Sequence, residues 1–66
     1  MEHLTKRQKE ILDFIQNYIQ SHDYAPSYRE IAEFFHLSSI ATVADHIGNL
    51  KNKGFLTKDF NEARSL

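Results

Sequence analysis

The fold is decided by one stretch of the chain, in which residues 27–53 read SYREIAEFFHLSSIATVADHIGNLKNK. Ser27 with Glu30 three residues later is a capping box, in which the two side chains satisfy backbone N–H groups at the start of a helix. A short helix is therefore predicted over about residues 27–35. Residues 36–38 follow as a tight turn.

A second, longer helix is predicted after that turn. Ser38 or Ser39 can cap its start, and Gly54 suits a left-handed position just past its end, which gives a helix of about fourteen residues. Two helices joined by so short a turn form a helix-turn-helix, expected at about residues 28–48. The apolar residues of the second helix share one stripe, which we expect to be buried: Ile40, Val43, Ile47 and Leu50.

The flanking segments complete a winged-helix pattern. Thr5 with Gln8 is another capping box, and apolar residues then recur at helical spacing, so a first helix is predicted over about residues 5–21. The predicted fold class is mainly α (α+β winged helix), a three-helix helix-turn-helix core with a C-terminal two-stranded β-hairpin wing over about residues 55–66. All of residues 1–66 form one domain.

The wing is expected to pair residues 55–58 with residues 63–66 across a polar turn. The sequence stops where the second strand should still be pairing, which indicates a shortened chain.

Composition narrows the possible functions. Apolar residues make up 41% of the chain, which is enough for a folded core, and there is no cysteine for a disulfide or a thiolate zinc site. No apolar run approaches the roughly 18 residues of a membrane span, and the N-terminus lacks the pattern of a signal peptide, so we expect a cytoplasmic protein without membrane contact. The net charge of −1 argues against indiscriminate coating of nucleic acid, so any DNA-binding surface must be local.

The side of the second predicted helix opposite its apolar stripe carries short side chains. At about 100° per residue, this side comprises Ala41, Asp45, Gly48 and Asn52, with Thr42, Ala44 and Asn49 at its margins. Small groups permit close approach to base edges, and a methyl such as that of Ala41 or Thr42 can meet a thymine methyl. The pattern favours insertion into a major groove, and the alternative is an ordinary solvated helix face.

Phosphate contacts are expected around that helix. The start of the preceding helix offers free N–H groups to an anion, and lysine and arginine supply the salt-dependent part of the affinity. For each lysine alone, a solvated surface charge is the alternative. The candidates are Ser27, Tyr28, Arg29, Lys51, Lys53, Lys58 and Arg64.

Catalysis and cofactor binding find no support in the sequence. The histidines His3, His22, His36 and His46 lie on different elements without i, i+4 pairing, so no zinc site is predicted. No serine lies in a G-x-S-x-G elbow, and two glycines provide no phosphate-cradling loop. We therefore predict no catalytic residue, no metal and no cofactor.

Four blocks of the sequence resemble the LexA repressor DNA-binding domain family, in register and without gaps. These blocks are Leu4-Thr5-Lys6-Arg7-Gln8, Pro26-Ser27-Tyr28-Arg29-Glu30-Ile31-Ala32, Ser39 with Thr42-Val43, and Leu50-Lys51-Asn52-Lys53-Gly54-Phe55-Leu56. The resemblance covers nearly the whole chain. It implies a winged helix that binds double-stranded operator DNA upstream of DNA-damage-response (SOS) genes.

The resemblance also implies roles for single residues. Base reading falls on Ser39, Ala41, Thr42, Ala44 and Asp45. Phosphate contact falls on Ser27, Tyr28, Arg29, Lys53 and Arg64. Full-length members of the family dimerise and cleave themselves through a C-terminal serine–lysine protease domain when the RecA filament stimulates them. That domain is expected to be absent from this chain.

The chain departs from the family pattern at several positions. His36 stands where the family often has glycine, so a left-handed backbone is predicted there. Ile40 replaces a common proline, and Ala41, Ala44 and Asp45 differ from better-known members, so no operator sequence can be transferred.

Two further expectations concern single residues. Gly48 is predicted to permit close approach of a phosphate or a base edge. The alternative function is a winged-helix protein-interaction module without DNA binding, with Phe60 at the wing tip as an apolar contact.

Overall fold

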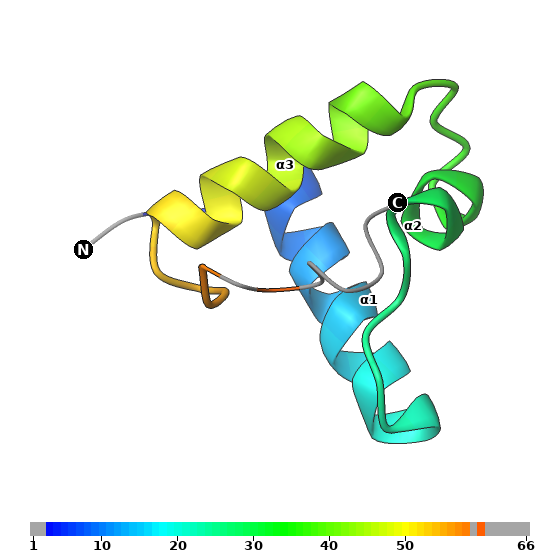
Figure 1. The fold of residues 1–66 in the computed structure, drawn as a ribbon. Helices are drawn as coiled ribbons and strands as arrows, with labels where there is room; N and C mark the ends of the chain where they lie inside the picture. The colour runs from blue at the N-terminus through cyan, green and yellow to red at the C-terminus, as the bar shows by residue number, and fades with distance from the viewer. Residues whose placement is uncertain (1–2, 59, 61–66) are drawn as a thin grey trace.

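The computed structural model describes residues 3–58 and 60, and three helices make up most of that part (Figure 1). Helix α1 spans Lys6–His22, α2 spans Tyr28–Phe34 and α3 spans Ile40–Asn52. Helix α3 lies across α1, and α2 lies beside the first turn of α3 (Figure 1). The predicted helix order is confirmed, with ends that differ by one or two residues.

Both predicted capping boxes are present. The Gln8 N–H donates to Thr5 Oγ1 at 3.1 Å, and the Thr5 N–H donates to Gln8 Oε1 at 3.1 Å. At the start of α2 the Glu30 N–H donates to Ser27 Oγ at 3.1 Å, and the Ser27 N–H donates to Glu30 Oε1 at 2.6 Å. Local sequence thus fixes where α1 and α2 begin.

Both turns that flank α3 are left-handed Schellman motifs. His36 has φ 59°, and the next amide, that of Leu37, donates to the Ala32 carbonyl at 2.8 Å. Gly54 has φ 85°, and the Phe55 amide likewise donates to a carbonyl in the last turn of α3 at 2.9 Å. The left-handed conformation predicted for His36 is confirmed, as is the role of Gly54.

The core is built from aliphatic side chains of all three helices. Leu12 and Ala32 border a fully buried group, which is made of Ile11, Ile15, Ile31, Val43, Ile47 and Leu50, each at most 1% exposed. Ile40 was predicted to share this stripe, but its side chain is 46% exposed. Its position in the first turn of α3 places it past the end of the core.

The expected wing is not seen in the described part of the chain. Residues 55–58 adopt bends and turns, and the described part of the chain contains no strand. The Phe60 amide donates to the Thr57 carbonyl at 3.1 Å, and Leu56 and Phe60 pack against the helical core. The expected second strand, residues 63–66, lies outside the described residues.

Phe60 itself was expected at the tip of the wing, available to a partner protein. Its packing against the core corrects that expectation.

Within the described ranges, no helix combines the length and apolar character that crossing a membrane requires.

Candidate nucleic-acid interface

The outer face of α3 is exposed from its first turn to its last, apart from half-buried Gly48. Val43, Ile47 and Leu50 hold the opposite face in the core at 0–1% exposure. In Figure 1, α3 forms one edge of the described fold, with α1 and α2 on the inner side of that helix. The exposed outer residues are Ala41, Thr42, Ala44, Asp45, Asn49 and Asn52. Four of the five predicted base-reading residues therefore share one accessible surface, which we call the α3 outer face.

Ser39, the fifth predicted base reader, is the N-cap of α3. Its Oγ accepts a hydrogen bond from the Ala41 amide at 3.1 Å, and the residue is half-buried. The hydroxyl proton is not used in this cap, so the side chain can still donate to an acceptor on DNA. Of the two serines that could have capped the helix, the structure selects Ser39.

Gly48 leaves open space on the same helix. A Cβ placed on Gly48 would meet no atom within 4 Å outside its own helix backbone and chain neighbours. Internal packing therefore does not require a glycine here, although glycine weakens a helix by roughly 1 kcal/mol relative to alanine. The predicted role in close approach to DNA fits this geometry.

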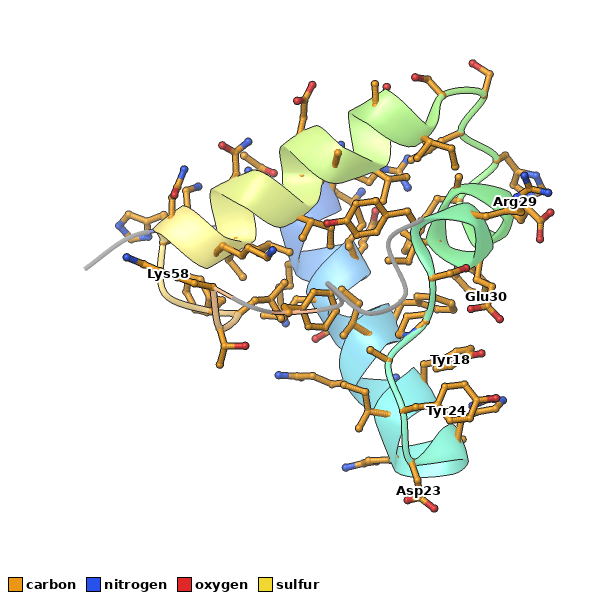
Figure 2. The ribbon with its side chains drawn as sticks, in the orientation of Figure 1. Tyr18, Asp23, Tyr24, Arg29, Glu30 and Lys58 are labelled. Carbon is orange, nitrogen blue, oxygen red and sulfur yellow. The ribbon has the colours of Figure 1, made fainter. Side chains whose placement is uncertain are left out.

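The predicted phosphate contacts at the start of α2 differ in accessibility. Ser27 is half-buried, and its amide and its hydroxyl oxygen are used in the capping box while its hydroxyl proton is not; Tyr28 packs against the core. Arg29 is exposed, and Figure 2 shows its side chain pointing away from α1. Arg29 is therefore the one of the three that presents a free cationic head to solvent.

Lys53 points into the fold rather than outward. Its Nζ donates to the backbone carbonyl of His3 at 2.7 Å and to Gln8 Oε1 at 2.8 Å. Gln8 is a polar residue of the core, only 5% exposed. Lys53 thus connects the end of α3 to the start of α1. Its ammonium group would have to leave these two hydrogen bonds to make the phosphate contact predicted for it. Arg64, the last predicted phosphate contact, lies outside the described residues.

Replacing Lys53 with methionine is expected to lower the free energy of unfolding by about 1–2 kcal/mol, because two charge-assisted hydrogen bonds are lost while the aliphatic stem is kept. Urea denaturation of the variant measures this loss. Lys58→Met, at an exposed position, is the control and should unfold like the wild type. Unchanged stability in Lys53→Met, combined with weaker DNA binding, would instead place the Lys53 ammonium on a phosphate.

One polar contact was not anticipated from the sequence. The Tyr18 hydroxyl of α1 donates to Glu30 Oε2 of α2 at 2.8 Å, across twelve residues of chain. This hydrogen bond to Glu30, with partial burial and the nearby negative charge, raises the pKa of Tyr18 to about 12. Its spacing has no helical or strand period, so no sequence pattern could have indicated it.

The raised pKa of Tyr18 predicts a pH dependence of stability. Because the native domain holds this proton more tightly than the unfolded chain, the stabilisation is complete below pH about 10 and is lost as pH rises from 10 to about 12. Phenolate absorbance during alkaline titration should show one late-titrating tyrosine that is missing in Tyr18→Phe. If the difference between the two curves has its midpoint near pH 10, the contact does not form in solution.

A second accessible feature lies between α1 and α2. Phe14 stacks on Phe34 at 4.3 Å between ring centroids, and Phe34 is still 59% exposed. These rings line a groove of about 660 Å³, together with Arg7, Glu10, Asn17 and Phe35. This groove was not predicted, although the two adjacent phenylalanines at positions 34 and 35 could have indicated it.

No grouping of three or more metal-ligating side chains occurs within residues 3–58 and 60. The arrangement on the α3 outer face instead offers hydrogen-bond donors, acceptors and methyl groups on an accessible helix, which are the means of contacting base edges.

Comparison with known proteins agrees with this geometry. Residues 1–65 match the family model described as LexA DNA binding domain. A LexA repressor of Koribacter versatilis is 56% identical over 63 residues, which cover 96% of this chain and 30% of that protein. LexA repressors of Bacillus mycoides and Bacillus thuringiensis are each 44% identical over 66 residues, which cover all of this chain and 32% of each relative.

The chain therefore spans about a third of the length of the curated relatives it matches. The match runs through all three helices and both Schellman turns, so the shared part includes the complete helix-turn-helix. On this match and on the fold, the chain belongs to the LexA DNA-binding domain family.

Proposed function

We propose that this domain binds double-stranded DNA sequence-specifically, with α3 in the major groove, as the DNA-binding part of a LexA-like transcriptional repressor of the DNA-damage response. The observation that carries the proposal is the α3 outer face, which is accessible and free of long side chains while the opposite ridge of α3 is buried. An α-helix with small outward groups can approach the floor of a major groove closely.

The proposed base readers are Ser39, Ala41, Thr42, Ala44 and Asp45. Asp45 can accept a hydrogen bond from the exocyclic amine of cytosine, and the Thr42 methyl can contact the methyl group of thymine. Phosphate contacts hold the register, with exposed Arg29 as the principal cation. Arg64 is proposed as a second cation. Ser27, Tyr28 and Lys53 are proposed as further contacts, which they would make in addition to, or in exchange for, their contacts within the fold.

Selection of bound sites from a random duplex pool, followed by a salt titration, tests this function. A sequence-specific domain should enrich one half-site, and its log affinity should fall linearly with log salt, by about 0.9 for each phosphate contact. Failure to enrich any sequence, or binding that does not depend on salt, would contradict the proposal.

Replacing Asp45 with alanine is expected to relax the preference for cytosine at one position of the selected site, by about 1–3 kcal/mol of discrimination. The rest of the site should be selected as before. Binding to duplexes with each base at that position measures the change. Asn17→Ala, at an exposed position of α1, is the control and should select the wild-type site unchanged. An identical site for Asp45→Ala and the wild type would remove Asp45 from the readout.

In the longer protein, the same proposal implies a homodimer that places two such domains on two half-sites, because one domain alone binds its half-site weakly. Self-cleavage stimulated by the RecA filament, and a cytoplasmic location, follow in the proposal from the family. Catalysis would belong to a region outside this chain.

A second candidate function is favoured by the aromatic groove. An exposed stack of Phe14 and Phe34 is the kind of apolar surface that binds proteins, so a winged-helix-type module that contacts a partner protein instead of DNA is the alternative. A partner-binding module would show no affinity for duplex DNA in the salt titration, which separates the two functions.

A further inference from the structure

One carboxylate joins α1, the connector and α2. Oε1 of Glu30 accepts from the Ser27 amide at 2.6 Å and closes the cap of α2, while Oε2 accepts from the Tyr18 hydroxyl of α1 at 2.8 Å. Figure 2 shows Tyr18 on α1 and Glu30 on α2 on the facing sides of these two helices. The Glu30 carboxylate thus links the N-terminal cap of α2 to α1.

The other end of α2 is attached to α1 by aromatic contacts. Phe14 of α1 packs against Phe34 at 4.3 Å and against Phe35 at 5.7 Å between ring centroids. These contacts add to the packing of Tyr28 and Ile31 in the core, which holds the inner face of α2. Loss of the Tyr18 contact is therefore expected to loosen the exposed side of the first turn of α2, because the connector before this turn is not helical.

Arg29 directly precedes Glu30, so loosening of this first turn moves the Arg29 side chain. Its side chain is exposed, and it lies on the face of α2 turned away from α1 (Figure 2). A cation that contacts a phosphate contributes most when its backbone is already fixed, since less freedom is then lost on binding. The orientation of α2 therefore controls what Arg29 contributes.

We propose that Tyr18 is a positioning residue for DNA binding, which acts through Glu30 to hold α2 and its Arg29 side chain toward the DNA backbone. This inference rests on the proposed function, and it adds a residue that contacts no DNA itself. At neutral pH the Tyr18 hydroxyl is protonated, as in any ordinary tyrosine, and it donates to the carboxylate at 2.8 Å.

The test begins with Tyr18→Phe, which removes the hydroxyl and keeps the ring that packs on Phe14 and His22. Circular dichroism establishes that the variant is folded at the binding temperature. We expect its affinity to fall by the same factor for the selected site and for random duplex, about three- to tenfold, which is the contribution of one charge-assisted contact. The salt slope should decrease by about 0.9.

Two glutamine variants control for charge. Glu30→Gln retains both hydrogen bonds, since its amide oxygen can accept from Ser27 and its amide nitrogen can donate to the Tyr18 oxygen. Glu33→Gln removes the same charge from an exposed position of α2. The two variants should therefore bind DNA alike.

A double-mutant cycle with Arg29→Ala gives the decisive readout. In the Arg29→Ala background, Tyr18→Phe should cause no further loss of affinity, because both substitutions act through the same contact of Arg29 with a DNA phosphate. A merely structural role of Tyr18 would give additive losses and would overturn the inference, as would wild-type affinity and salt slope in folded Tyr18→Phe. These outcomes leave the proposed function intact, whereas absence of DNA binding by the wild-type domain rejects both.

Discussion

Replacing Ile47 with alanine is expected to leave the domain largely unfolded. Ile47 is 1% exposed and lies in the middle of the buried ridge of α3, where α1 and α2 both contribute core residues. Truncation of a buried isoleucine to alanine costs about 2–5 kcal/mol, and a domain of this size has a total stability of about 3–5 kcal/mol. Circular dichroism and urea denaturation measure the loss.

The conservative change Ile47→Val separates packing from recognition. It should lower stability by only about 0.5–1.5 kcal/mol and leave a folded domain that binds DNA with wild-type affinity. Thr42→Ala, on the exposed side of the same helix, should leave stability nearly unchanged. If Ile47→Ala lost less stability than Thr42→Ala, the buried and exposed faces of α3 would have been assigned the wrong way round.

Replacing Gly48 with alanine is expected to stabilise the domain and to weaken its binding to DNA. Stability should rise by up to about 1 kcal/mol, because alanine favours a helix and the added methyl meets no atom within 4 Å. On the DNA complex the same methyl would separate α3 from a phosphate or base edge, and the operator affinity should fall by about tenfold or more. Thermal unfolding and fluorescence-anisotropy titration measure the two effects.

The opposite signs of these two effects make the Gly48 experiment informative. Gln20→Ala, an exposed change to alanine on α1, should alter stability slightly and leave the affinity as it was. An increase in stability of Gly48→Ala without any loss of operator affinity would mean that DNA does not approach this part of α3 closely.

The features predicted correctly from the sequence are governed by residues close together in the chain. The capping boxes of Thr5 and Ser27 and the left-handed backbone at His36 depend on three or four neighbouring residues, and each is present in the structure. The ridge of α3 was predicted correctly except at Ile40, because helical periodicity gives the face of a residue and not the point at which the core ends.

The features that could not be predicted depend on contacts between distant segments. Lys53 donates to Gln8 across 45 residues, and Tyr18 donates to Glu30 across 12, and neither separation follows a repeating pattern. Helical and strand periods describe one element at a time, so they cannot predict contacts between residues of different elements. No strand is seen at residues 55–58, and the segment expected to pair with them lies outside the described residues.

DNA binding through α3 is tested most directly by the change in backbone amide chemical shifts when the selected duplex is added to the domain. Large shifts are expected at Ala41, Thr42, Ala44, Asp45 and Gly48, and at Arg29, with little change at Phe14 and Asn17. Shifts confined to the aromatic groove of α1 and α2, with no change on the α3 outer face, would contradict binding through α3.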